Sequence, residues 1–172
     1  MDKYVELAKK TIETYIKSGQ LTECPPELPE ELLINKAGVF VSLHKKSNHD
    51  LRGCIGTFQP TKQNIGQEII SNAVSAAFRD PRFNPLTAEE LNDLEINVDV
   101  LSEPELIQSK DDLDVKKYGV IVKSKDGHLG LLLPDIDGVN NVDDQIAIAC
   151  RKAGLNPSET IALYRFTVER HK

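Results

Sequence analysis

The sequence predicts an α+β fold in which helices pack on a mainly antiparallel sheet. Two pairs of apolar, β-branched runs are each joined by a short polar turn, within residues 37–58 and 118–133. The segments 3–18 and 64–78 instead repeat their apolar residues every three or four positions, which is the spacing of a one-sided helix. Because hairpins dominate this order, alternating βαβ units are not expected.

The N-terminal part is predicted to run from a helix into a hairpin. Residues 3–18 form the helix, which is followed by Gly19, a typical helix terminator. The proline-rich connector 24–29 has few backbone donors and is expected to cross the surface in extended form. Strands at 37–43 and 51–58 then pair antiparallel across a polar turn.

The rest of the chain mixes helices, hairpins and single strands. The helix 64–78 ends before Pro81, since the residue that precedes a proline disfavours the α region. Thr87 and Glu90 have the spacing of a capping box, which predicts a short helix. The remaining predicted elements are a strand at 94–101, a hairpin at 118–133, a helix at 143–153 and a closing strand at 161–168.

Composition limits the class of protein before any motif is considered. The chain has 172 residues, a formal net charge of −6 and three cysteines without a C-x-x-C pair. We therefore expect one domain with reduced thiols in the cytoplasm, and no disulfide framework or zinc knuckle. No apolar run is long enough to span a membrane. The basic residues are scattered among acids, so nucleic-acid binding is not expected.

The segment Leu51-Arg52-Gly53-Cys54-Ile55-Gly56-Thr57 is the least ordinary stretch of the chain. Glycines weaken a strand, so two of them indicate a bulge or the close approach of another backbone or a ligand. In a regular strand Arg52, Cys54 and Gly56 share one face, and Leu51, Gly53 and Ile55 share the other. We interpret this segment as a functional surface.

The sequence supports two interpretations of Cys54. A guanidinium two positions away favours the thiolate, which a reactive cysteine requires. Alternatively Cys54 is a small buried apolar side chain, as free cysteines often are. A nucleophile also needs a base, for which the candidates are His44, His49 and His128. His44 approaches Cys54 only in one hairpin register, which the sequence does not determine. His49 is expected in a turn and His171 in solvent.

Asp80-Pro81-Arg82-Phe83 forms a second cluster. It is either a rigid turn, in which Asp80 pairs with Arg82 or a nearby amide, or a charged wall beside the glycine strand. The acids Asp135, Asp137, Asp143 and Asp144 lack the spacing of a calcium loop and are expected to be solvated. No metal or other cofactor is predicted, because phosphate-binding, dinucleotide-binding and zinc-peptidase motifs are all absent from the sequence.

Five sequence motifs occur in a fixed order along the chain. They are LRGCIGTF at 51–58, AGVFVSL before it, DPRFNPLTAEEL at 80–91, GLLLP at 130–134 and CRKAGL at 150–155. This pattern resembles the AMMECR domain family, across nearly all of residues 1–170, and is similar to its small stand-alone prokaryotic members of the AmmeMemoRadiSam system. The chain departs from the family by having no tryptophan, where relatives often place one after LLLP and another after KAGL.

The resemblance implies a single domain over 1–172, made of a larger and a smaller lobe that pack intimately around an interlobe cleft near the hexapeptide. It also implies a Memo-like protein and a radical S-adenosylmethionine protein as partners. The family supplies no established reaction. The residues that match its motifs are Leu51, Arg52, Gly53, Cys54, Ile55, Gly56, Asp80 and Arg82.

Three functional hypotheses follow. The leading one is an accessory or binding protein whose cleft beside these residues receives a peptide segment or a small anionic ligand, because arginine suits carboxylate or phosphate. The second is an enzyme that uses Cys54 as a nucleophile. The third, nucleic-acid binding through Lys45, Lys46 and Arg52, has the least support in the sequence.

Overall fold

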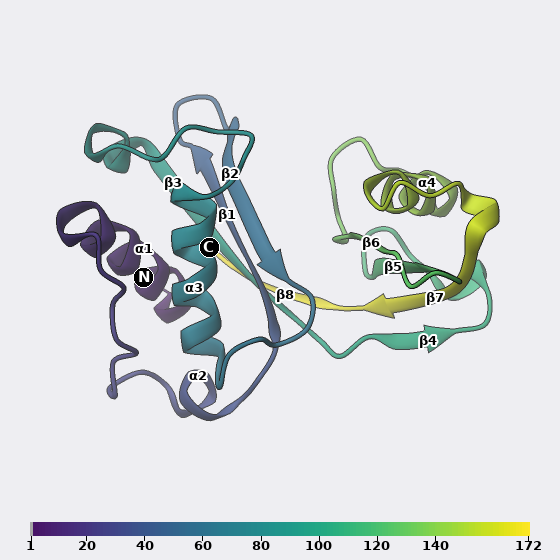
Figure 1. The fold of residues 1–172 in the computed structure, drawn as a ribbon, viewed down its shortest axis with the longest axis horizontal. Coiled ribbons are helices and arrows are strands. Elements are labelled where there is room, and N and C mark those ends of the chain that lie inside the picture. Colours follow the sequence, from purple (N-terminus) through teal and green to yellow (C-terminus); the bar gives the residue numbers. More distant parts are fainter. Residues whose placement is uncertain (1) are drawn as a thin grey trace. The chain divides into compact units, whose positions relative to one another are not determined.

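The computed structural model describes residues 2–172, apart from the side chain of Ile161. The fold is α+β, and the chain divides into two compact units. Unit 1 comprises residues up to Leu101 together with Glu169–Lys172, and unit 2 comprises Ser102–Val168. Each unit contains its own four-stranded sheet and its own helices (Figure 1).

Unit 1 places its two long helices, α1 and α3, on one face of its sheet (Figure 1). The strand order is β2-β1-β3-β8, and β1 pairs antiparallel with both β2 and β3. The helices are α1 (Lys3–Ser18), α2 (Glu30–Ile34) and α3 (Ile65–Phe78). The strands are β1 (Gly38–Lys45), β2 (Leu51–Thr57), β3 (Leu94–Leu101) and β8 (Val168–His171).

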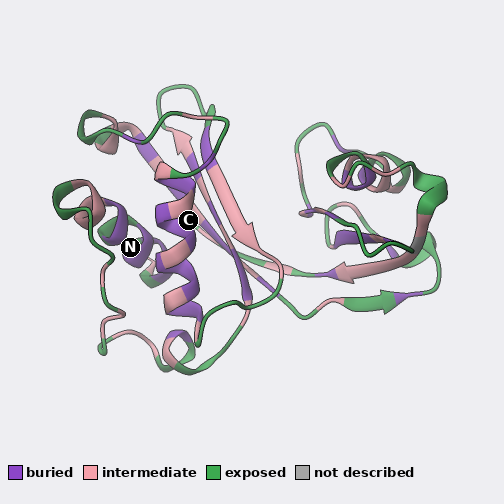
Figure 2. Ribbon diagram, viewed as in Figure 1, coloured by how far each residue is buried: buried purple, intermediate pink, exposed green. Residues whose placement is uncertain are grey.

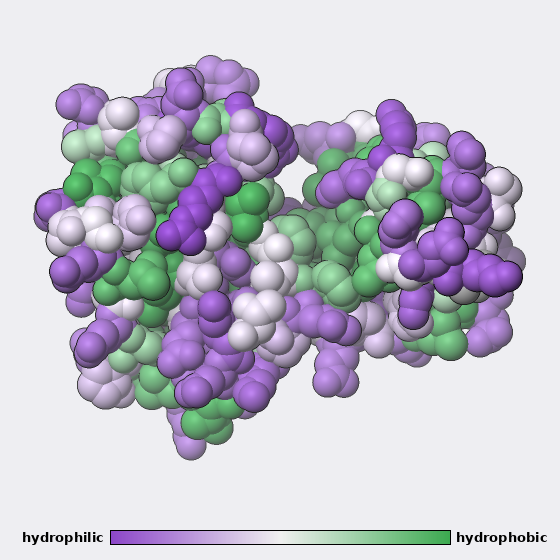
Figure 3. All heavy atoms as spheres, viewed as in Figure 1, coloured by the Kyte–Doolittle hydropathy of each residue, from purple (hydrophilic) through white to green (hydrophobic). Residues whose placement is uncertain are grey.

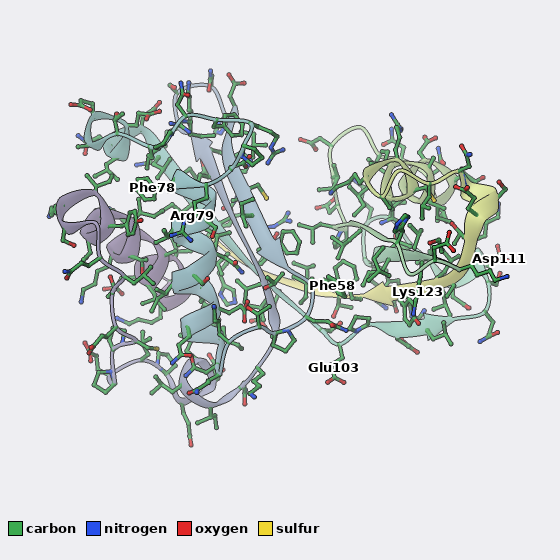
Figure 4. All side chains as sticks on the ribbon, viewed as in Figure 1. Phe58, Phe78, Arg79, Glu103, Asp111 and Lys123 are labelled. Atoms are coloured by element: carbon green, nitrogen blue, oxygen red, sulfur yellow. The ribbon has the colours of Figure 1, made fainter. Side chains whose placement is uncertain are left out.

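The core of unit 1 lies between these helices and the sheet. Ile12 of α1, Ile69 of α3 and Val41 of β1 are completely buried in it. Buried residues follow almost the whole length of α3 (Figure 2). The Phe78 ring at the end of α3 contacts the Tyr15 ring of α1, with centroids 4.8 Å apart (Figure 4). The one-sided periodicity of the sequence is therefore the packing face of each helix.

Unit 2 is smaller and has one α-helix packed on an antiparallel sheet. The strand order is β4-β7-β5-β6. Its elements are β4 (Glu105–Ile107), β5 (Gly119–Ser124), β6 (Leu129–Leu132), α4 (Val142–Lys152) and β7 (Thr160–Phe166). Cys150 is completely buried in the core under α4, together with Val120 and Ala149, as the periodicity of that helix predicts.

Most predicted elements are confirmed, and three details differ. The predicted closing strand at 161–168 is confirmed as β7 up to Phe166, but Val168 already begins a further strand, β8, which joins the sheet of unit 1. The connector 24–29, expected to be extended, contains a turn in which the Leu28 N–H donates to the Pro25 carbonyl, and the helix α2 after it was not predicted. His171, expected in solvent, has a side chain only 10% exposed and stacks on Tyr4 with ring centroids 3.7 Å apart.

No helix within residues 2–172 is both long and apolar enough to cross a membrane.

Candidate functional site

The hexapeptide forms most of β2, an edge strand of the sheet of unit 1. Cys54 lies directly opposite Ser42 of β1, and Gly53 lies opposite Leu43. The pairing shifts between Leu43 and His44, where Arg52 is the extra residue of a bulge. The predicted alternation is confirmed beyond the bulge, because Gly53 faces α3 whereas Gly56 faces Phe40 on the other side of the sheet.

Each glycine of β2 is required by a different neighbour. A Cβ atom at Gly53 would overlap the backbone carbonyl oxygen of Ala76 in α3, so this position lets the helix approach the strand closely. A Cβ atom at Gly56 would overlap the ring of Phe40 on the neighbouring strand. The close approach that the glycines indicate is therefore made by a helix backbone and by an aromatic ring of the same unit.

The peptide groups of Cys54 are held from the open edge of the sheet by the Asp80-Arg82 turn. Asp80 accepts the backbone N–H of Cys54 at 2.9 Å, and Nη2 of Arg82 donates to the Cys54 carbonyl at 3.3 Å. Asp80 also accepts from Nε and Nη2 of Arg82, at 3.0 and 2.8 Å. The first interpretation of this cluster is confirmed in its contacts, because Asp80 pairs both with Arg82 and with a nearby amide.

The two charged groups of this turn have very different exposure. The Asp80 side chain is 2% exposed, whereas that of Arg82 is 55% exposed. Hydrogen bonds from Arg82, and from the Cys54 and Arg82 backbone, hold the pKa of Asp80 well below its usual range despite burial. Hydrogen bonding to Asp80 also raises the pKa of Arg82. A buried carboxylate therefore orients an exposed guanidinium.

Arg52 is held by a separate carboxylate. Its Nε and Nη2 donate to Glu90 at 2.6 and 3.0 Å, and Nη2 also donates to the Asn84 carbonyl at 3.0 Å. Arg52 is only 8% exposed, and its Nη1 is buried without a hydrogen-bond partner among the described residues. Hydrogen bonding to Arg52 lowers the pKa of Glu90 to about 2. Arg52 thus fastens the loop that contains Glu90 to β2.

Phe83 lies between the two arginines. Its ring centroid is 5.8 Å from the guanidinium carbon of Arg52 and 5.5 Å from that of Arg82. Both distances lie within the range of cation–π attraction. The ring is half-buried. The segment 80–90 therefore attaches to β2 at three places: the Cys54 peptide groups, the Arg52 side chain and this ring.

The sheet face opposite α1 and α3 carries polar residues around the cysteine. We call it the Cys54 face and define it by Phe40, Ser42, Cys54 and Asn97, which are all half-buried. Ser42 lies opposite both Cys54 and Asn97, so these three side chains form a row across β2, β1 and β3. The Asn97 Oδ1 atom is buried without a hydrogen-bond partner among the described residues.

The sequence did not single out Asn97, Phe40 or Glu90 as residues of this site. Asn97 and Phe40 reach it through strand register, which the hairpin bulge shifts at one end. Glu90 was expected only as a helix cap, and it does accept the Thr87 N–H at 2.9 Å. Its second role, binding Arg52, joins residues 38 positions apart and depends on how the loop packs.

The predicted site residues thus divide into those at the Cys54 face or the adjacent strand edge and those that lie elsewhere. Cys54, Gly56, Asp80 and Arg82 lie at the Cys54 face or at the strand edge beside it. Gly53 and Ile55 face the core, Leu51 is exposed at the strand end, and Arg52 is buried on Glu90. His44 is two positions beyond Ser42 on β1, whereas His49 is 81% exposed in a turn.

Two of the four acids between residues 135 and 144 form separate, exposed ion pairs. Lys116 binds Asp135 at 3.0 Å, and Lys110 binds Asp143 at 2.8 Å. Across the described part of the chain, no group of three or more His, Cys, Asp or Glu side chains is placed to hold a metal ion.

These features define a class: an α+β protein whose glycine-containing edge strand presents a half-buried cysteine, fastened by an aspartate–arginine turn. A family model described as AMMECR1 matches residues 5–171, so the chain belongs to the AMMECR1 family.

Relatives of known sequence and structure agree with this assignment. A protein of Thermotoga maritima is 49% identical over 170 residues, which cover 98% of this chain and 97% of the relative. A protein of Clostridium acetobutylicum is 46% identical over 99% of this chain but only 36% of its own length. The crystal structure of uncharacterized protein PH0010 from Pyrococcus horikoshii matches with a TM-score of 0.88 and 36% identity, over 97% of this chain and 88% of that one.

Proposed function

We propose that this protein is an accessory or binding protein whose Cys54 face receives a segment of a partner protein or a small anionic ligand. The observation that carries the proposal is the fastening of the Cys54 peptide groups by Asp80 and Arg82. A site whose backbone is fixed in advance loses less conformational entropy when it binds.

The exposed guanidinium of Arg82 favours a ligand that contains hydrogen-bond acceptors. Arg82 uses Nε and Nη2 for its bonds to Asp80 and Cys54, and no bond to Nη1 occurs among the described residues. Its exposed side therefore suits a carboxylate, a phosphate or a peptide carbonyl. A polypeptide segment and a small anion both supply such acceptors.

The proposed partners are a Memo-like protein and a radical S-adenosylmethionine protein. The test is a calorimetric titration of the purified chain with each of them. We expect Arg82→Ala to weaken binding at least tenfold, and Cys54→Ala to weaken it as well. The matched control is Lys9→Ala, on the exposed side of α1, which should bind like the wild type. Unchanged binding by both site variants would overturn the site, and failure of both proteins to bind would overturn the partners.

A second candidate function, thiol-dependent group transfer, is favoured by one observation. Nη2 of Arg82 donates to the Cys54 carbonyl at 3.3 Å, so a guanidinium is held at the residue that would carry the thiolate. An adjacent cation stabilises a thiolate. The test is the rate of Cys54 alkylation against pH in a variant without Cys24 and Cys150. A midpoint near ~8.5, the ordinary value for cysteine, would exclude an activated nucleophile.

A further inference from the structure

The side chain of Phe40 lies over Gly56, next to Cys54 on the Cys54 face. Phe40 is directly opposite Gly56 in the pairing of β1 with β2. A Cβ atom at Gly56 would overlap the Cγ, Cδ1 and Cδ2 atoms of the ring, and all three to a similar degree. Such an overlap means that the face of the ring, and not its edge, covers the glycine. The absence of a side chain at Gly56 therefore lets the ring lie flat on β2.

The ring of Phe40 is only half-buried, whereas its neighbours on β1, Val39 and Val41, are completely buried in the core. An aromatic ring over a strand glycine covers backbone that has no side chain of its own. Because one face of the ring lies against Gly56, its exposed part belongs to the rim and to the other face. Figure 3 shows that the surface of unit 1 combines hydrophobic areas with hydrophilic ones. Phe40 adds a flat apolar surface to the otherwise polar Cys54 face.

Charged groups lie on both sides of this ring. Beside β2, the guanidinium of Arg82 binds the Cys54 carbonyl, and the Arg82 side chain is 55% exposed. Cys54 and Gly56 are two positions apart, which corresponds to about 7 Å along a strand. On β3, the residue opposite the ring is Asp99, whose buried carboxylate is bound by Arg170 at 2.7 and 2.9 Å. An acidic group is therefore attracted on the Arg82 side of the ring and meets a neutralised carboxylate on the other side.

We infer that the Cys54 face binds an acidic group that carries a flat ring, and that Phe40 is the residue that selects the ring. This inference rests on the proposed function and names the chemical class of its ligand: Arg82 binds the acidic group, and the ring stacks on Phe40. Stacked aromatic rings attract each other beyond the effect of their buried area. An aliphatic acid would make the contact with Arg82 alone, and a neutral aromatic molecule would make the contact with Phe40 alone.

The test is an NMR titration of the isotope-labelled whole chain with phenylbutyrate, hexanoate and phenylbutanol, which supply the ring with the acid, the acid alone and the ring alone. We expect phenylbutyrate to bind at least fivefold more tightly than either of the others, with the largest shifts at the amides of Cys54 and Gly56. A blocked phenylalanyl-glutamyl dipeptide, titrated in the same way, shows whether a polypeptide presents the two groups better than a small acid does. No binding of either ring-bearing acid, or equal binding of phenylbutyrate and hexanoate, would overturn the inference.

Variants separate the contribution of the ring from that of the charge. Phe40→Leu keeps an apolar side chain but has no flat ring, so it should abolish the preference for phenylbutyrate over hexanoate and leave hexanoate binding unchanged. Arg82→Ala should weaken both acids by the same factor. The matched control is Tyr15→Leu, because Tyr15 is a half-buried aromatic residue of α1 that contacts Phe78 on the helix side of the sheet. Circular dichroism of each variant checks that the fold is retained. A folded Phe40→Leu protein that keeps the preference would overturn the inference.

The inference and the proposed function can fail separately. If Arg82→Ala weakens the binding of the partner proteins but the probes show no preference for a ring, the proposed function stands and the selection by Phe40 is wrong. If Arg82→Ala changes the binding of neither the partner proteins nor the probes, the site itself is wrong.

Discussion

The carboxylate of Asp80 accepts the backbone N–H of Cys54 at 2.9 Å, although the two residues lie 26 positions apart. β2 is an edge strand, and Asp80 accepts a backbone hydrogen bond on the side where another strand would pair. The edge of a sheet is a place where proteins associate unless it is blocked. At Cys54 the block is a charged turn, and the same turn positions the exposed Arg82.

Asp80→Asn is expected to lower the free energy of unfolding by about 1–3 kcal/mol, because an amide cannot accept all the charge-assisted hydrogen bonds that the carboxylate accepts. Urea denaturation at pH 7 measures the loss. Asp126→Asn, in the exposed turn between β5 and β6, is the control and should unfold like the wild type. An Asp80→Asn protein of full stability would contradict the role that we give this carboxylate.

The stability of the protein should fall in acid as these carboxylates gain protons. The pKa of Asp80 and that of Glu90 are both lower in the folded protein than in the unfolded chain. Each therefore stabilises the fold fully above its unfolded pKa, and this stabilisation is lost as the pH falls toward the folded pKa. For Glu90 the loss extends from pH 4.5 to about 2.

Urea denaturation at a series of pH values measures this dependence. The control is Glu90→Gln, which should lose less stability across the same range, since it has no carboxylate to protonate at that position. Parallel curves for the wild type and Glu90→Gln would show that the Arg52–Glu90 pair does not contribute to the acid sensitivity.

The two glycines of β2 should differ in their tolerance of alanine. At Gly53 the obstacle is a backbone carbonyl of α3, which moves only if the helix moves. At Gly56 the obstacle is the Phe40 side chain. We expect Gly53→Ala to destabilise the fold by about 3 kcal/mol or more, as severe overpacking does, and Gly56→Ala to cost less.

A double variant separates the two causes. Phe40→Ala should partly rescue Gly56→Ala, because removal of the ring removes the overlap, and it should not rescue Gly53→Ala. Thermal unfolding of the single and double variants measures the coupling. Gly19→Ala provides a reference for backbone conformation alone, since Gly19 has φ +68° and no atom near a Cβ. Its cost should be about 1 kcal/mol.

Arg170→Ala is expected to destabilise unit 1 by about 3 kcal/mol, because it leaves a buried carboxylate without its main partner. Nε and Nη2 of Arg170 bind Asp99 at 2.7 and 2.9 Å, and the Asp99 side chain is 4% exposed. Addition of Asp99→Asn to Arg170→Ala should recover part of the stability by removing the buried charge. Urea denaturation of the two single variants and the double variant gives the coupling energy, and simple additivity would contradict this account.

The elements of the fold could be predicted where local pattern determines them. The helix 3–18 and the strand 94–101 were predicted with the bounds that the structure gives, because α1 and β3 each bury one regular face. The closing strand could not be divided correctly from its sequence. Nothing in the run 161–168 indicates that its two ends belong to different sheets, since that division depends on the fold of the whole chain.

The candidate site could be predicted only in part, for the same reason. Alternation along β2 placed Cys54 and Gly56 on one face correctly, because side chains of a strand alternate. The environment of the Arg52 side chain could not be predicted, because it depends on the ion pair with Glu90. Glu90 reaches Arg52 because the loop 80–90 packs against β2. The arginine that binds the backbone of Cys54 is Arg82, whereas the sequence suggested Arg52 as the cation beside the thiol.

The return of the chain to its first sheet has a consequence for the order in which the two units fold during synthesis. β8 lies beside β3 in the sheet of unit 1, yet all of unit 2 is encoded between them. The residues of unit 2 are contiguous, so its sheet has all four of its strands once Phe166 has left the ribosome. Unit 1, although it is made first, has to keep the outer side of β3 open until residues 168–171 emerge. Unit 1 is therefore synthesised first, but its sheet is completed after the sheet of unit 2. This order is the reverse of the usual one, in which the N-terminal unit folds first.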